Sequence, residues 1–354
     1  MGLLYTQMKV FHYQEKLASL PSSSDVLLPP LHVRIKPTNV CNHKCSYCAY
    51  RNEDMQLGQD MNVRDSIPRG KMLELIDDLQ EMGVKAVTFS GGGEPFCYPH
   101  MLEAAGRLAD AKVKFASLTN GSRLNGEVAE LFAAHATWIR ISMDGWDDAS
   151  YSEYRQVPDG EYSRIMANIA SFKRYRGNCY VGISLIVDQK NAAHVYHMID
   201  KLYDIGVDSV KVSPCIVSNS GRENNAYHAP IFQRVKAEVD RAIGDFAGNN
   251  FEIFDSYHAL DEKFTRTYSW CPNIQIRPVV GADCNVYACQ DKAYNLKNGL
   301  LGSIKEQNFR SFWFSGKDKF HSIKPDSHCL HHCVANGMNI KIHEYLAADH
   351  LEFV

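Results

Sequence analysis

The stretch CNHKCSYCAY, residues 41–50, places three cysteines in a C-x3-C-x2-C array. Closely spaced thiolates favour soft metals such as zinc and the iron of iron–sulfur clusters. Because structural zinc sites and most iron–sulfur clusters take four protein ligands, three thiols leave one iron of a [4Fe–4S] cluster open to a substrate or cofactor. A zinc site completed by His43 and a chance grouping of cysteines are the alternatives that the spacing leaves open.

The overall composition is that of a globular protein with a large core. The chain has 354 residues, of which 45% are hydrophobic and 22% are charged, and its net charge is -3. This balance gives no electrostatic case for binding nucleic acid or a membrane surface. No apolar run reaches the roughly 18–20 residues that span a bilayer. We therefore expect neither nucleic acid nor a membrane as a partner.

The N-terminus and the cysteines favour a cytoplasmic protein. The stretch MGLLYTQMKV lacks the charged and apolar regions of a secretory signal. Gly2 and Thr6 fit the short myristoylation pattern, which recurs by chance. Eleven cysteines in such a chain indicate metal binding in a reducing compartment, not disulfides. Eight of them fall in two groups, and Cys97, Cys179 and Cys215 are expected to be small buried side chains.

Strand-like and helix-like patterns alternate between residues 31 and 249, which predicts an α/β fold. Six short apolar runs are each followed by an amphipathic segment; the runs are HVRIKP, VKAVTF, VKFASLT, WIRISM, CYVGISLIV and DSVKVSP. Six such units predict a parallel sheet, either open and doubly wound or curved into a barrel. Residues 1–30 read as a leader segment. Residues 250–354 hold five cysteines, two predicted short strands and a polar C-terminal helix, which we interpret as a small domain held by metal.

The three-cysteine array resembles that of the radical S-adenosylmethionine (SAM) superfamily, because it follows a first strand and Tyr47 precedes its third cysteine. The resemblance covers residues 31–354 and implies a partial (β/α)6 TIM-like barrel, in agreement with the six units. It also implies that Cys41, Cys45 and Cys48 hold a [4Fe–4S] cluster, whose open iron chelates the amino and carboxylate groups of SAM.

Residues at the ends of the next three predicted strands resemble SAM contacts of that family. Gly92, Gly93 and Glu94 match a stretch whose backbone and carboxylate receive the methionine ammonium, since glycines allow close approach and a carboxylate complements a cation. The other matches are Thr119 and Asn120 at a SAM-facing strand end, Ser142 and Asp144 as contacts to ribose or the methionine carboxylate, and Arg155 as a partner of that carboxylate. Ligands of parallel α/β folds bind at the carboxyl ends of strands, where all these residues fall. The alternatives are a buried strand serine for Ser142 and a solvated helix charge for Arg155.

The second cysteine group resembles the SPASM or shortened twitch extension of radical SAM enzymes, which binds auxiliary iron–sulfur clusters. The full SPASM pattern needs more cysteines than the five present here, so the resemblance implies one auxiliary [4Fe–4S] cluster. It assigns the ligands as Cys271, Cys289, Cys329 and Cys333. It leaves out Cys284, which stands where the family commonly has a glycine. A zinc site using four of the five thiols, or His331 and His332, is the alternative.

The resemblance implies reductive cleavage of SAM to methionine and a 5′-deoxyadenosyl radical, which removes a hydrogen atom from an unactivated C–H bond. The cofactor supplies this chemistry, and an electron donor such as flavodoxin or ferredoxin supplies the electron. We expect a radical SAM oxidoreductase, epimerase or lyase that acts on a small polar substrate by dehydrogenation, epimerisation or elimination. A carbohydrate or nucleotide-sugar is favoured as the substrate.

Two other functions stay open. Modification of a peptide or protein is disfavoured by the short stretch before Cys41, since peptide-modifying members often carry a long leader-binding domain. A non-catalytic metal-binding scaffold protein is the alternative outside enzymes. Cys284 is the candidate catalytic residue, because its S–H bond is weak enough to return a hydrogen atom to a substrate radical. Its alternative role is a small apolar residue packed in a hairpin.

Overall fold

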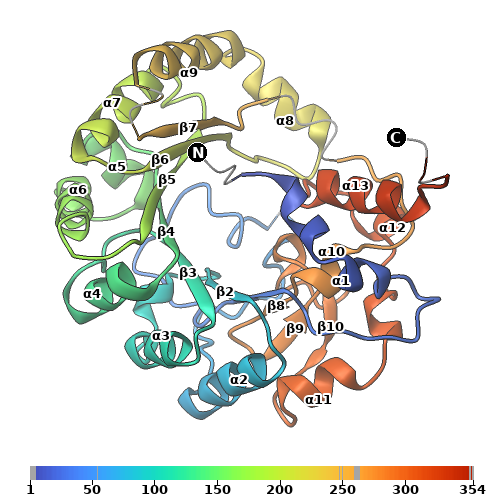
Figure 1. The fold of residues 1–354 in the computed structure, drawn as a ribbon. Coiled ribbons are helices and arrows are strands. Elements are labelled where there is room, and N and C mark those ends of the chain that lie inside the picture. Colours follow the sequence, from blue (N-terminus) through green and yellow to red (C-terminus); the bar gives the residue numbers. More distant parts are fainter. Residues whose placement is uncertain are drawn as a thin grey trace.

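One sheet of ten strands runs through the part of the chain that the computed structural model describes, residues 5–53, 55–246, 248, 250–258, 264–350 and 352. Its strand order is β10-β9-β8-β1-β2-β3-β4-β5-β6-β7. Strands β1 to β7 run parallel, each paired with the next, and the sheet curves so that helices ring its outer face (Figure 1). The strands are β1 His32–Ile35, β2 Ala86–Phe89, β3 Lys114–Thr119, β4 Trp138–Met143, β5 Tyr180–Val187, β6 Ser209–Pro214, β7 Glu252–Asp255, β8 Val279–Val280, β9 Asn285–Tyr287 and β10 Leu300–Ser303.

The six predicted strand-and-helix units are present, and the predicted α/β partial barrel is confirmed. The α-helices are α1 Gln14–Ala18, α2 Arg69–Glu81, α3 Met101–Asp110, α4 Gly126–His135, α5 Asp148–Arg155, α6 Glu161–Phe172, α7 Val195–Ile205, α8 Gly221–His228, α9 Phe232–Phe246, α10 Asn273–Ile276, α11 Phe309–Phe314, α12 Pro325–His328 and α13 Asn336–Ala347. Short 3-10 helices are η1 Gln7–His12, η2 Pro95–Cys97, η4 Gln290–Lys292 and η5 Asp318–Phe320. Each predicted strand is followed by the expected helix. Apolar residues that recur with a 3.6-residue period form one helix face, and this face packs against the sheet.

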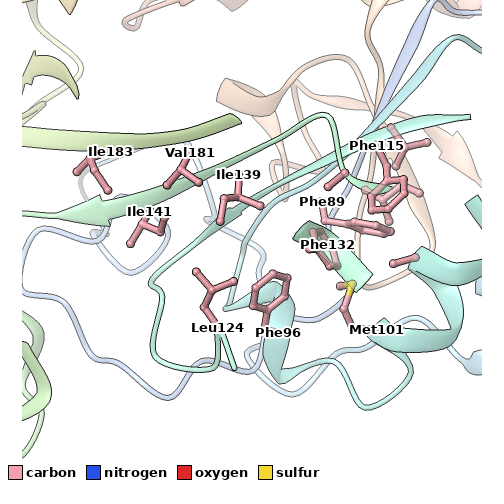
Figure 2. Packing of buried hydrophobic residues seen from close by; sticks show 14 of the residues in the cluster. Phe89, Phe96, Met101, Phe115, Leu124, Phe132, Ile139, Ile141, Val181 and Ile183 are labelled. Carbon is pink, nitrogen blue, oxygen red and sulfur yellow. The ribbon is translucent and has the colours of Figure 1, made fainter. Parts of the chain in front are cut away.

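The core lies between the sheet and the outer helices. Strand residues alternate in direction, so one set packs under the helices while the other faces the barrel interior. Phe132 of α4 contacts Phe96 and Phe115 edge-on, with ring centroids 4.9 Å and 5.3 Å away. Figure 2 shows this aromatic group beside Ile139 and Ile141 of β4. The interior-facing set includes the charged residues Arg34 of β1, Lys36 directly after β1 and Arg140 of β4.

The sheet continues beyond the predicted boundary at residue 249. Strand β7 pairs with β6, and β8 pairs in parallel with β1, so the C-terminal region extends the sheet at both ends. Strands β8 and β9 form an antiparallel hairpin, and β10 pairs with β9. Two short strands were expected in this region, and its described residues hold four. The short length of each strand explains why the pattern missed them. The three-part division of the chain stays a prediction.

The N-terminal segment packs on the C-terminal region. Val10 and Leu17 form a small apolar cluster with Ile342 of α13, beside the main core. Lys317 donates to the backbone carbonyls of Ser19 and Pro21, at 2.6 Å in each case. Figure 1 shows the blue N-terminal helices lying against the red C-terminal helices. In the described residues we find no helix with the length and apolar character that crossing a membrane requires.

Candidate active site

The three-cysteine loop leaves the sheet at the carboxyl end of β1. Cys41, Cys45 and Cys48 are half-buried. The loop is tied to α5, because the Lys44 amide donates to the Arg155 carbonyl at 2.9 Å. Burial raises the pKa of the Cys41 thiol to about 11, and the neighbouring Cys45 adds to the effect. The structure therefore holds three thiols on one short loop at the end of the barrel where ligands bind.

The glycine-rich loop after β2 packs directly against the residues that precede Cys41. The Gly93 amide donates to the Thr38 carbonyl at 3.1 Å, and the Glu94 amide donates to the Val40 carbonyl at 3.0 Å. A Cβ atom on Gly93 would lie 2.2 Å from the Val40 carbonyl oxygen, so no other residue fits there. Gly92 is similarly confined, since its Cβ would lie 2.1 Å from Asn39 Oδ1.

Glu94 is positioned by the residues predicted with it. Its carboxylate, 3% exposed, accepts from Thr119 Oγ1 at 2.6 Å and from the Asn120 amide at 2.7 Å. Burial raises the pKa of this carboxyl. Asn120 Nδ2 donates to Asn42 Oδ1 at 2.9 Å, and Asn42 donates to Ser122 Oγ at 2.8 Å. Sequence reasoning missed Asn42 and Ser122, although Asn42 lies inside the cysteine motif itself.

A second buried group joins the cysteine loop to β4 and α5. Asp144, 1% exposed, is ion-paired with Arg155 and also accepts from the Tyr47 hydroxyl. Arg155 Nη1 lies 3.5 Å from the Cys45 sulfur. Burial raises the pKa of Asp144. Ser142 of β4 precedes Asp144 by two residues, and Asp144 directly follows the end of that strand, so the alternation of a strand predicts both on the same face. Three of the four predicted residues, Tyr47, Asp144 and Arg155, therefore meet beside Cys45.

These residues fit a [4Fe–4S] cluster with SAM beside it. Thiolates are the donors that iron–sulfur clusters take. Asp144 Oδ1, Arg155 Nε and Asn39 Oδ1 are buried and lack a hydrogen-bond partner within the described chain. Such orphaned polar atoms indicate a missing polar ligand. His43, which a zinc site would need, has its Nε2 atom 3.2 Å from Glu161 Oε1, while its Nδ1 atom is buried without a hydrogen-bond partner in the described residues.

The second cysteine group is assembled from three distant segments. The four members are Cys271 before α10, Cys289 after β9, Cys329 after α12 and Cys333 before α13. Burial raises the pKa of Cys289 well above its usual range, and the charges of Asp291 and of the other three cysteines add to that shift. Burial raises the pKa of Cys271 to about 11 and that of Cys333 to about 12. Asn339 Nδ2 lies 3.3 Å from the Cys271 sulfur.

No three His, Cys, Asp or Glu side chains in the described segments converge as the ligands of a single metal ion would. A cubane cluster distributes its thiolates over four irons, so it does not demand that convergence. Cys333 is buried and the other three cysteines are half-buried, and an auxiliary [4Fe–4S] cluster at this group stays a prediction.

Cys284 joins neither cysteine group. It lies in the turn between β8 and β9 with φ at 59°, a conformation that favours glycine and accounts for the glycine usual there in the family. Its thiol is buried in the main core on the helix-covered side of the sheet. The charged groups that interact electrostatically with the Cys284 thiol include Asp283, Lys71 and Lys305. None of these three is a predicted site residue. Its proposed role as a hydrogen-atom donor stays a prediction.

A pocket of about 320 Å³ lies between the barrel and the C-terminal region. Lys211 and Ser213 of β6 line it on one side, and Asp291, His331 and His332 line it on the other. His331 is 4% exposed, and both of its ring nitrogens are buried without a hydrogen-bond partner in the described residues. The wall also includes Ala49 and Gln290, which follow Cys48 and Cys289. The pocket therefore lies beside a cysteine of each group.

The sequence and fold are similar to those of known enzymes. Residues 35–202 match the family model of the radical SAM superfamily. A probable GTP 3′,8-cyclase of Halobacterium salinarum is 27% identical over 168 residues, which cover 48% of this chain and 46% of that protein. SuiB of Streptococcus suis, in a crystal structure with the precursor peptide SuiA, matches with a TM-score of 0.65 and 16% identity over 91% of this chain and 73% of that one. Native anSMEcpe with bound AdoMet matches with a TM-score of 0.59 and 20% identity over 82% and 83% of the two chains.

Residues 35–202 therefore carry a radical SAM domain, and the fold of the chain is similar to the folds of SuiB and anSMEcpe. The radical SAM family uses a [4Fe–4S] cluster and SAM. The chain spans less than half the length of the first curated relative, so its own substrate and partners are matters of proposal.

Proposed function

We propose that the enzyme removes a hydrogen atom from a small polar molecule bound in the pocket between the two cysteine groups. The observation that carries this proposal is the position of the pocket, whose wall contains the neighbours of Cys48 and Cys289. When bound, the cluster and SAM supply the 5′-deoxyadenosyl radical that takes the hydrogen atom. The residues proposed to hold them are the three loop cysteines and the Glu94 and Asp144 groups described above.

The protein's own residues bind, orient and exclude water. Lys211, Asp291 and His331 offer charged or polar groups to a substrate. The unpartnered ring nitrogens of His331 can donate or accept one hydrogen bond each once a ligand is present. A volume of about 320 Å³ is near the lower end of ligand pockets, about the size of one sugar ring or one amino-acid side chain.

Within the class of small polar substrates, a carbohydrate or nucleotide-sugar is our narrower proposal. Only the size and polarity of the pocket support it. A peptide is the second candidate, because the fold is similar to that of SuiB in complex with its precursor peptide. One side chain of a peptide would fill the same pocket. For either substrate we propose that Cys271, Cys289, Cys329 and Cys333 hold an auxiliary [4Fe–4S] cluster, and that flavodoxin or ferredoxin donates the electron.

The test is a substrate screen on anaerobically reconstituted enzyme with a strong reductant. Sugars, aminocyclitols and nucleotide-sugars form one panel, and short peptides form the other. We expect a member of the first panel to raise 5′-deoxyadenosine above the uncoupled level. Ser213→Trp, which fills the pocket, should abolish that rise while full iron content is kept. A rise in 5′-deoxyadenosine with peptides alone would favour a peptide substrate. A rise that persists in Ser213→Trp would refute the pocket as the substrate site.

A further inference from the structure

Lys36 is a fully buried cation at the carboxyl end of β1. Its exposure is 0%, and its Nζ atom donates to the Tyr50 hydroxyl and to the Gly91 carbonyl. The ammonium also lies 4.5 Å from the centroid of the Tyr50 ring. Neither hydrogen-bond partner carries a full charge. A buried ammonium is costly unless an anion nearby offsets its lost hydration, so the surroundings of Lys36 should contain one.

The contacts of Lys36 connect the cysteine loop with the C-terminal extension. Tyr50 follows Cys48 by two residues. The Lys36 amide donates to the Val280 carbonyl of β8 at 2.8 Å. The Tyr50 ring packs edge-on against Tyr294, with centroids 6.3 Å apart. Lys36 therefore lies at the seam between the two regions that carry the cysteine groups.

The anions around Lys36 belong to both cysteine groups. Burial lowers the pKa of Lys36 well below its usual range and Arg34 adds to that shift, whereas Asp291, Cys289 and Cys48 oppose it, in decreasing order. Arg34 adds a second cation on the same face of β1, and Arg277 and Arg34 both act on Asp291. One carboxylate shared among these cations does not neutralise them. The further negative charge that would keep Lys36 protonated is that of the thiolate-bound clusters proposed for the two groups.

We infer that Lys36 is a counter-charge shared by the two cluster sites, and that it raises the reduction potential of both clusters. This inference rests on the proposed pair of clusters. A thiolate-bound cluster becomes more negative on reduction, so a buried cation nearby stabilises the reduced form. Lys36 acts through the clusters and takes no part in bond breaking.

The test is potentiometric titration of both clusters with detection by electron paramagnetic resonance. Lys36→Met keeps a similar volume and removes the charge, so both midpoint potentials should shift to more negative values. Lys292→Met is the matched control. Lys292 is also buried, but it acts on Cys329 of the second group, so its loss should shift the auxiliary cluster alone. Two unchanged potentials in Lys36→Met, or a shift of one cluster only, would overturn the inference.

Lys36→Arg keeps the test decisive if the methionine variant loses iron. Lys36→Met could lose iron while Lys36→Arg keeps full iron and near-normal potentials. That result would show that the charge itself is required, in support of the inference. Loss of iron in both variants would show that shape, not charge, matters at this position, and would refute it. Iron analysis of the wild-type enzyme tests the underlying proposal of two clusters by itself. A wild-type enzyme with a single cluster would refute the auxiliary cluster, and with it the shared counter-charge, before any variant is made.

Discussion

The two cysteine groups of this protein are built in opposite ways. Cys41, Cys45 and Cys48 lie on one loop and are half-buried, with hydrogen bonds to α5 and to the glycine-rich loop. The members of the second group come from segments between residues 271 and 333, which only folding brings together. A local motif can be recognised from its spacing alone, whereas an assembled site depends on every element between its parts.

The largest effect should follow a change in the local group. Cys45→Ala should abolish formation of 5′-deoxyadenosine, because two thiols cannot hold the SAM-binding cluster with its open iron. The measurement is product formation under a strong reductant, with iron analysis beside it. Cys179→Ala, outside both groups, is the control and should retain full activity. Equal product from Cys45→Ala would remove the local group from the reaction.

The independence of the two groups is tested by removing one of them completely. The wild-type enzyme should hold about eight irons, and the triple variant Cys41→Ala, Cys45→Ala, Cys48→Ala should hold about four. The second site should load without the first, since its ligands lie in other segments. Iron analysis and electronic absorption give the count. A triple variant that binds only zinc would contradict the auxiliary cluster.

The buried pair beside Cys45 should matter for both folding and SAM binding. Arg155→Gln leaves the Asp144 carboxylate buried without its cation, which should lower the free energy of unfolding by about 3–5 kcal/mol. The affinity for SAM should also fall, by tenfold or more. Arg310→Gln breaks the exposed pair with Glu81 and should cost less than about 1 kcal/mol. Calorimetry on both variants measures the loss in free energy of unfolding. Equal losses would show that the buried Asp144–Arg155 pair contributes no more to stability than an exposed pair.

Cys284 should show the smallest effect. Cys284→Ser should keep both clusters, because the thiol lies in the helix-covered core and not with either group. A packing cost of about 1 kcal/mol is expected, with turnover intact. Blocked formation of an inverted product, with hydrogen abstraction retained, would instead establish the donor role. Loss of iron from one cluster would make Cys284 a ligand.

The sequence alone predicted the elements that repeat a clear pattern. The six strands and their helices were foreseen because alternation and the 3.6-residue period are local properties of the chain. The cysteine loop was foreseen because its ligands lie within one short stretch. The short strands β7 to β10 were partly missed, since two to four residues carry too little pattern to be recognised.

The tertiary structure decided which residues meet. It joined Asn42 to Asn120 and Asp144 to Tyr47, placed Lys36 between the two cysteine regions and turned Cys284 into the core. It also placed the pocket between β6 and the extension. No spacing rule could supply these facts, because burial and contact depend on how distant segments pack. The sequence by itself determined the chemistry at the end of β1, since ligands close in the chain need no fold to be near one another. The fold decided the rest, because a buried charge without a partner, or one shared between two sites, exists only where the packing of distant segments has excluded water.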